Sequence, residues 1–110
     1  MSLPIAFRPE ARAELIDAWS WYEEQRPGLG DELEACVEAA IGAAARSPAG
    51  HRRVYAEVRR VLVKRFPYSV YYLVEDEVLL VLAVAHSRRK PHYWAARIRT
   101  ADGPKNEEGP

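Results

Sequence analysis

One basic segment that begins with a histidine, His86-Ser87-Arg88-Arg89-Lys90, is the part of this sequence best suited to chemistry on a phosphate. An imidazole exchanges a proton near neutral pH, and guanidinium groups stabilise the negative charge that develops on a phosphate during transfer. Cleavage of RNA by its own 2′-hydroxyl needs both kinds of group. Arg65 and Arg89 could stabilise the charge in such a reaction, and His86 could move the proton.

The same residue types also suit a surface that only binds. His86 ends an apolar stretch, where a hydrogen-bonded structural imidazole is more common than a catalytic one. Tyr93 is followed by Trp94, and this aromatic pair fits a hydrophobic plug as well as a proton donor. Proton transfer and binding therefore both remain open for this segment.

The charge distribution favours a binding surface. The 110 residues carry 16 basic and 16 acidic side chains, but residues 1–50 sum to −5, residues 51–99 to +7 and residues 100–110 to −2. Because the basic part has few acids nearby to pair with, we expect it to attract an anionic partner. The residues predicted to meet that partner are Arg59, Arg60, Lys64, Arg65, Arg88, Arg89 and Trp94.

Cofactor and metal sites are not predicted. The single cysteine, Cys36, cannot form an internal disulfide, and the three histidines, His51, His86 and His92, have no recognised ligand spacing. The longest apolar run, residues 78–85, is too short to span a bilayer, and residues 1–8 lack the features of a secretion signal. We therefore expect a cytoplasmic protein with no membrane partner.

Two amphipathic helices are predicted in the first half. Pro9 suits the first turn of a helix that ends near Gln25, and its expected core face is Ala11, Leu15, Ala18, Trp19 and Tyr22, with Trp21 pointing elsewhere. The loop at residues 26–30 contains Pro and Gly, and Asp31 is the expected N-cap of the second helix, which stops at residues 47–50.

Strands dominate the second half. We predict antiparallel strands at residues 58–66, 69–74 and 78–86 joined by tight turns, with the last strand covered on both faces, and an edge strand at residues 5–7. A short amphipathic piece ends near Arg99. The predicted fold is one α+β domain of residues 1–99, in the order β-α-α-β-β-β with room for one more strand, whose helical hairpin packs on an antiparallel sheet. Residues 100–110 are expected to form a tail.

Four pieces in this order resemble the RelE/ParE superfamily of bacterial type II toxin-antitoxin toxins, and more closely the ParE branch, often labelled plasmid stabilisation proteins. The pieces are Ala18-Trp19-Ser20-Trp21-Tyr22-Glu23-Glu24-Gln25 with Pro27-Gly28-Leu29-Gly30; Val58-Arg59-Arg60; Arg65-Phe66-Pro67-Tyr68 with Tyr71-Tyr72; and His86-Ser87-Arg88-Arg89-Lys90-Pro91 with Tyr93-Trp94 and Arg97.

This resemblance implies a function and its alternatives. ParE-like toxins inhibit DNA gyrase, RelE-like toxins cleave mRNA in the ribosomal A site, and a small antitoxin silences both. We expect a gyrase inhibitor that acts by binding, with a cognate antitoxin that brings carboxylates to the basic part. The alternatives are a ribosome-dependent mRNA endoribonuclease, in which Tyr93 stands near the C-terminal tyrosine of RelE-like enzymes, and a non-toxic antitoxin-binding module. A homodimer is left open.

Overall fold

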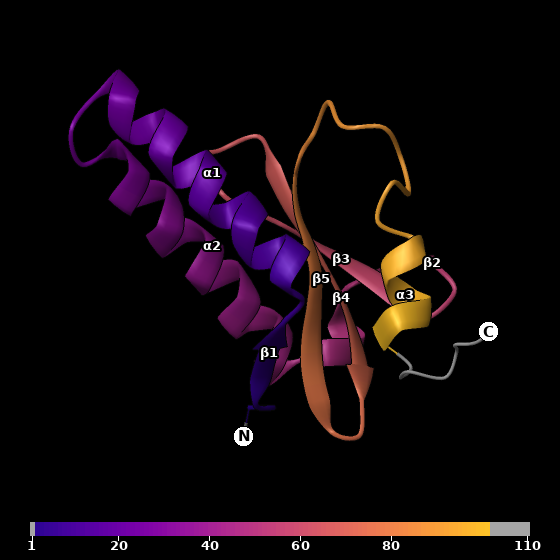
Figure 1. Ribbon diagram of the computed structural model, residues 1–110. Helices are drawn as coiled ribbons and strands as arrows, with labels where there is room; N and C mark the ends of the chain where they lie inside the picture. The colour runs from indigo at the N-terminus through magenta and orange to yellow at the C-terminus, as the bar shows by residue number, and fades with distance from the viewer. Residues whose placement is uncertain (1, 102–110) are drawn as a thin grey trace.

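The computed structural model describes residues 2–101, with side chains described as far as Ile98. Within these residues, nine elements follow one another (Figure 1). They are β1 (Ile5–Phe7), α1 (Pro9–Gln25), α2 (Leu29–Arg46), the 3-10 turn η1 (Pro48–Gly50), β2 (Arg52–Tyr55), β3 (Val58–Leu62), β4 (Tyr68–Glu75), β5 (Val78–His86) and α3 (Ala96–Ala101).

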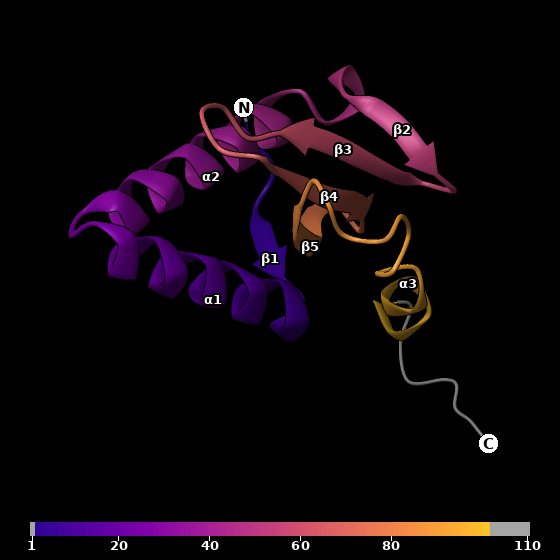
Figure 2. The same cartoon turned by 90° about the horizontal axis from the view of Figure 1, so that it is seen from above.

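The strands form one mixed five-stranded sheet in the order β1-β5-β4-β3-β2. The helical hairpin α1–α2 lies on one side of the sheet and α3 on the other, as Figure 2 shows. The α+β class and the hairpin-on-sheet arrangement are confirmed. The sheet is not purely antiparallel as predicted, because β1 pairs in parallel with β5. The additional strand is β2, which precedes the predicted meander.

The α1 helix buries a narrower stripe than its sequence predicts. Ala11, Leu15 and Ala18 are buried, and Tyr22 packs partly against the same core. Trp19 is only half-buried, and its indole N–H donates to the Asp31 carboxylate at 2.9 Å. The prediction that Trp19 belongs to the core is therefore wrong, because its polar edge finds a partner across the hairpin. Trp21 is 56% exposed, as expected.

The turn between the helices is organised by Glu23 rather than by Asp31. Helix α2 begins at Leu29 after Gly28, whose φ of 91° lies in the left-handed region that favours glycine. The Glu23 carboxylate accepts hydrogen bonds from the Gly28 and Gly30 amides, both at 2.8 Å. The predicted N-cap at Asp31 is wrong, because these amides are already satisfied from α1.

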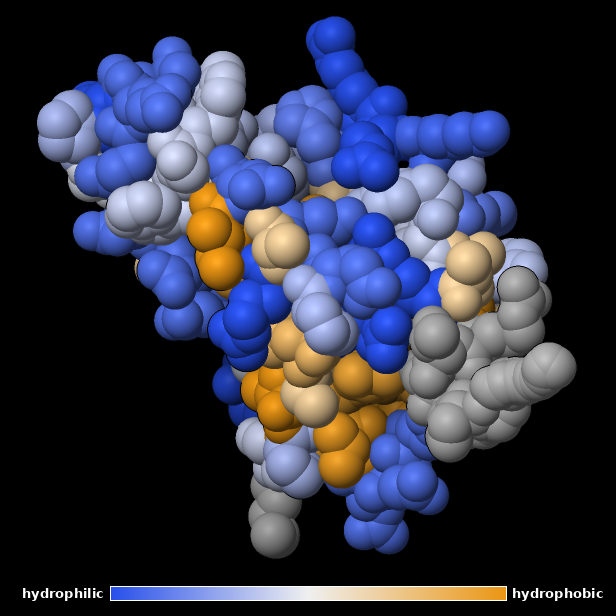
Figure 3. Space-filling view, in the orientation of Figure 1, coloured by the Kyte–Doolittle hydropathy of each residue, from blue (hydrophilic) through white to orange (hydrophobic). Residues whose placement is uncertain are grey.

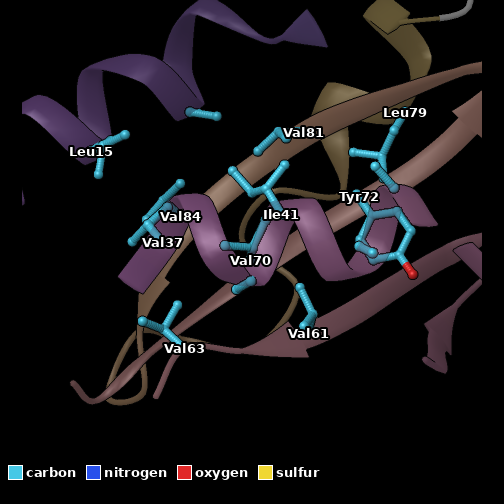
Figure 4. Close-up of a cluster of buried hydrophobic side chains, with 14 of the residues drawn as sticks. Leu15, Val37, Ile41, Val61, Val63, Val70, Tyr72, Leu79, Val81 and Val84 are labelled. Carbon is cyan, nitrogen blue, oxygen red and sulfur yellow. The ribbon is translucent and has the colours of Figure 1, made fainter. Parts of the chain in front are cut away.

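Apolar side chains fill the space between the hairpin and the sheet (Figure 4). Leu15 of α1 and Val37 and Ile41 of α2 point toward side chains of β3, β4 and β5. A second cluster on the opposite face contains Val58, Leu73, Leu82, Ala83 and Trp94. Strand β5 is thus covered on both faces, as its apolar sequence predicts.

Local irregularities decide which face each residue occupies. Tyr71 pairs with Ala83 but Tyr72 pairs with Val81, so Leu82 is an extra residue in β5. This bulge reverses the alternation, and Val81 and Val84 both face the helices.

The β3 strand ends at Leu62 instead of residue 66, because the chain turns before Pro67, which has no amide to donate to the sheet.

Candidate functional site

Two turns rich in cations meet at one end of the sheet. Residues 63–67 connect β3 to β4, and residues 87–92 follow β5. The Ser87 amide donates to the Pro67 carbonyl oxygen at 2.8 Å, and Tyr68 pairs with His86 beside it. We call these two turns the basic end; it lies at the top of Figure 1, and strongly hydrophilic side chains project there in Figure 3. Its cations are Lys64, Arg65, Arg88, Arg89 and Lys90.

Most cations of the basic end are unpaired. Arg65 is bound to Glu32 of α2 at 2.7 Å, and the hydrogen bond from Arg65 lowers the pKa of that carboxyl. Within residues 2–101, the side chains of Lys64, Arg88 and Lys90 form no ion pair. The expectation that the cations of residues 51–99 find few acids to pair with is thus wrong for Arg65, and also for Arg97, which pairs with Glu14, because folding brings acids of the helices to both.

Arg89 and Tyr93 form a stacked pair at the edge of this end. The Arg89 guanidinium carbon lies 3.8 Å from the centre of the Tyr93 ring, a cation–π arrangement. The Tyr93 hydroxyl donates to Glu14 at 2.7 Å. Burial, and secondly this bond to a carboxylate, raise the pKa of Tyr93. Both effects favour the neutral phenol over the phenolate.

His86 is held by the chain that follows it. Its Nδ1 accepts a hydrogen bond from the Arg88 amide at 3.0 Å, and its ring meets Tyr68 edge-on with the centroids 5.1 Å apart. A cavity of about 280 Å³ lies beside it. Side chains from α1, β4, β5 and the following turn line this cavity, among them Asp17, Trp21, Tyr68, His86 and Arg89.

Glu14, a carboxylate that was not predicted from the sequence, lies beneath the Arg89–Tyr93 pair. Glu14 accepts hydrogen bonds from the Val84 amide at 3.0 Å, from the Tyr93 hydroxyl and from the Arg97 guanidinium at 3.0 Å. Both Glu14 and Arg97 are only 16% exposed. The sequence contained one signal: Glu14 is three residues after Ala11 and four before Ala18, so it borders the buried stripe of α1.

Three predicted surface residues lie away from the basic end. Arg59 faces the helix side, where its Nη1 donates to the His51 carbonyl oxygen at 2.7 Å. Arg60 lies on the opposite side of β3, across from Arg52 and Tyr71 in the neighbouring strands. Trp94 is 1% exposed and stacks on Tyr71, so its side chain belongs to the second cluster and not to a surface.

No group of histidines, cysteines and acids that would hold a metal ion occurs within residues 2–101. The histidines have separate environments: His51 contacts the Tyr72 hydroxyl, His86 contacts the Arg88 amide, and His92 lies against Tyr55. In the same part of the chain, no helix combines the length and the apolar character that crossing a bilayer requires.

Two sequence comparisons lead to ParE toxins. The sequence profile described as "ParE toxin of type II toxin-antitoxin system, parDE" matches residues 5–91. The protein named Toxin ParE2 of Mycobacterium tuberculosis (strain CDC 1551 / Oshkosh) is 28% identical over 86 residues, which are 77% of this chain and 82% of that protein.

The fold is shared with solved toxin structures. A chain of the chromosomal ParDE toxin-antitoxin system from P. aeruginosa aligns with a TM-score of 0.68 at 15% identity, over 77% of this chain and 96% of that one. A mutant of the E. coli toxin RelE in the free state aligns with a TM-score of 0.62 at 20% identity, over 90% and 98% of the two chains.

Proposed function

Because the chain belongs to the ParE toxin family and is the toxin of a type II toxin-antitoxin system, we propose that it inhibits DNA gyrase by binding it. The observation that carries this proposal is that the side chains that would move protons in a nuclease are already held in hydrogen bonds within the protein. The Tyr93 hydroxyl is bound to Glu14, and His86 Nδ1 is bound to the Arg88 amide. Arg65, the expected phosphate ligand, is paired with Glu32.

These contacts favour binding over proton transfer. A general base must accept a proton from the attacking hydroxyl, but Tyr93 already donates to a carboxylate and its pKa is raised. One nitrogen of His86 is likewise occupied. The residues of the nuclease alternative are therefore better placed to hold the basic end together than to exchange protons with a substrate.

The basic end supplies the binding surface. Lys64, Arg88 and Arg89 are exposed, and the charge of each is available to a partner. Complementary charge accelerates association and fixes orientation, so the partner surface should carry carboxylates or phosphates. We propose that gyrase and the cognate antitoxin compete for this end, the antitoxin through acidic side chains that neutralise the exposed cations.

A two-assay experiment tests the proposal. The purified protein is added to a DNA gyrase supercoiling reaction and, separately, to a ribosomal translation extract in which mRNA integrity is followed. We expect inhibition of supercoiling and intact mRNA. Arg89→Glu should weaken inhibition about tenfold or more, because it reverses a charge at the interface. Arg52→Glu, the same reversal on exposed β2, is the matched control and should have little effect.

The His86→Ala variant distinguishes inhibition by binding from cleavage of mRNA. A binder should keep most of its potency if the variant folds, whereas a nuclease that uses this imidazole would lose turnover by roughly a hundredfold or more. Cleaved mRNA with unaffected supercoiling would replace the proposal with the endoribonuclease. A protein that binds its antitoxin but affects neither assay would be the non-toxic module.

A further inference from the structure

We infer that Glu14 is a positioning residue that fixes Arg89 at the basic end by holding residues 93–97 against the sheet. The inference rests on the proposed function for the role of Arg89 in binding. The carboxylate joins three parts of the chain that are far apart in sequence: it projects from α1, accepts from the Val84 amide of β5, and accepts from Tyr93 and Arg97.

Glu14 and Arg97 also close the open edge of β5. The edge strand β1 ends at Phe7, which pairs with Val81, and within residues 2–101 no strand covers the β5 groups beyond Val81 on that side. The Leu82 carbonyl oxygen accepts from Arg97 at 2.8 Å, and the Val84 amide donates to Glu14 at 3.0 Å. The two side chains thus take the place of a neighbouring strand, and in doing so they anchor the segment that carries Arg97.

The connection to Arg89 runs through the Tyr93 ring. The hydroxyl end of this ring is fixed by Glu14, and its face carries the Arg89 guanidinium at 3.8 Å. Arg89 itself is exposed and forms no ion pair within residues 2–101. Contact with the Tyr93 ring is therefore the main restraint on the direction of the Arg89 side chain. Glu14 in turn fixes the position of the Tyr93 ring.

Hydrogen exchange tests the anchoring directly. In Glu14→Gln the side chain keeps its size but loses the charge that pairs with Arg97, and the amides of residues 93–98 should exchange about tenfold faster. Amides of α2 and β4 should keep their rates. Asp17→Asn is the matched control. Asp17 lies one turn further along α1 and, like Glu14, lines the cavity beside His86. Its substitution should change neither the exchange of residues 93–98 nor that of α2 and β4. Equal acceleration throughout the domain would overturn the inference, since Glu14 would then act on global stability alone.

A double-mutant cycle tests the action through Arg89. Inhibition of purified gyrase is measured for wild type, Glu14→Gln, Arg89→Ala and the double variant. We expect Glu14→Gln to weaken inhibition about tenfold in the wild-type background and by less than threefold when Arg89 is already absent. A full Glu14→Gln effect in the Arg89→Ala background would overturn the inference.

Tyr93→Phe guards against a variant that fails to fold. It removes only the hydroxyl bond to Glu14 and keeps the ring, so the domain should remain folded while residues 93–98 exchange faster and inhibition weakens. Unchanged exchange in both Tyr93→Phe and Glu14→Gln would refute the anchoring, whatever the target. A wild-type protein that does not inhibit gyrase would instead refute the proposed function. In that case the double-mutant cycle of Glu14→Gln and Arg89→Ala is repeated with growth arrest as the measured quantity, and it decides whether Glu14 still acts through Arg89. Absence of growth arrest by the wild type would refute the action of Glu14 through Arg89.

Discussion

The face of the sheet that receives α1 and α2 is closed by apolar side chains of two long helices, whereas the opposite face is closed by a short segment around Trp94. The first closure includes Leu15, Val37 and Ile41 and extends along three strands. The second depends on one buried tryptophan and on the hydrogen bonds of Glu14 and Arg97. The difference separates a face that makes the domain stable from a face that positions the residues proposed to bind.

The largest expected effect lies on the helix face. Leu79→Ala removes a side chain that is 0% exposed and leaves a cavity, so the free energy of unfolding should fall by about 2–5 kcal/mol. Urea denaturation followed by circular dichroism measures it. Leu62→Ala, at a position that is 65% exposed, is the control and should stay within about 0.5 kcal/mol of wild type.

Trp94→Ala sharpens the comparison on the other face. Truncation of a buried tryptophan normally lowers the free energy of unfolding by about 3–5 kcal/mol. Here the loss cannot exceed the free energy that attaches residues 93–98 to the sheet, because this segment can detach while the rest of the domain stays folded. We expect a loss below about 3 kcal/mol and rapid exchange confined to residues 93–98. A loss larger than that of Leu79→Ala would show that the two faces unfold as one unit.

The helix–helix turn should respond next in size. A Cβ on Gly30 would lie 2.5 Å from the Trp19 carbonyl oxygen, so Gly30→Ala should cost about 1–3 kcal/mol, measured by thermal and urea unfolding. Gly42→Ala is the matched control within the same helix, because its Cβ would meet only the flexible end of Arg46 at 3.4 Å. That variant should be neutral or stabilising by up to about 1 kcal/mol. Equal losses at both positions would contradict the steric argument.

The smallest effect concerns pH. The Arg65 hydrogen bond holds the pKa of Glu32 below its ordinary value of 4.5. Since the unfolded chain then binds more protons in this range, the contribution of the pair is present above pH 4.5 and is lost as pH falls below it. Glu32→Gln should flatten the decline of the urea midpoint between pH 5 and pH 3, approximate limits set by ordinary carboxyl pKa values. Glu38→Gln, an exposed neighbour on α2, should leave the decline unchanged.

Much of the architecture could be predicted from the sequence because it depends on local patterns. The 3.6-residue period of Ala11, Leu15 and Ala18 places α1, and the apolar run at residues 78–85 indicates a covered strand. The bulge at Leu82 could not be predicted, because an extra residue leaves no mark in a continuous apolar run. Trp19 was misplaced because an amphipathic stripe does not say whether an indole N–H finds a partner.

By itself, the sequence determined the helical hairpin, the three-strand meander of the basic half, the cationic segment after the last strand and the resemblance to a toxin family. It did not place β2, and it assigned the turn at residues 63–67 to a strand. Only the tertiary structure decided that Arg65 meets Glu32, 33 residues away, and that Arg97 meets Glu14, 83 residues away. It also decided that Trp94 is core rather than surface. The physical reason is that the period of a segment reports which of its faces is buried, whereas the partner of a charge depends on which elements are brought together in space.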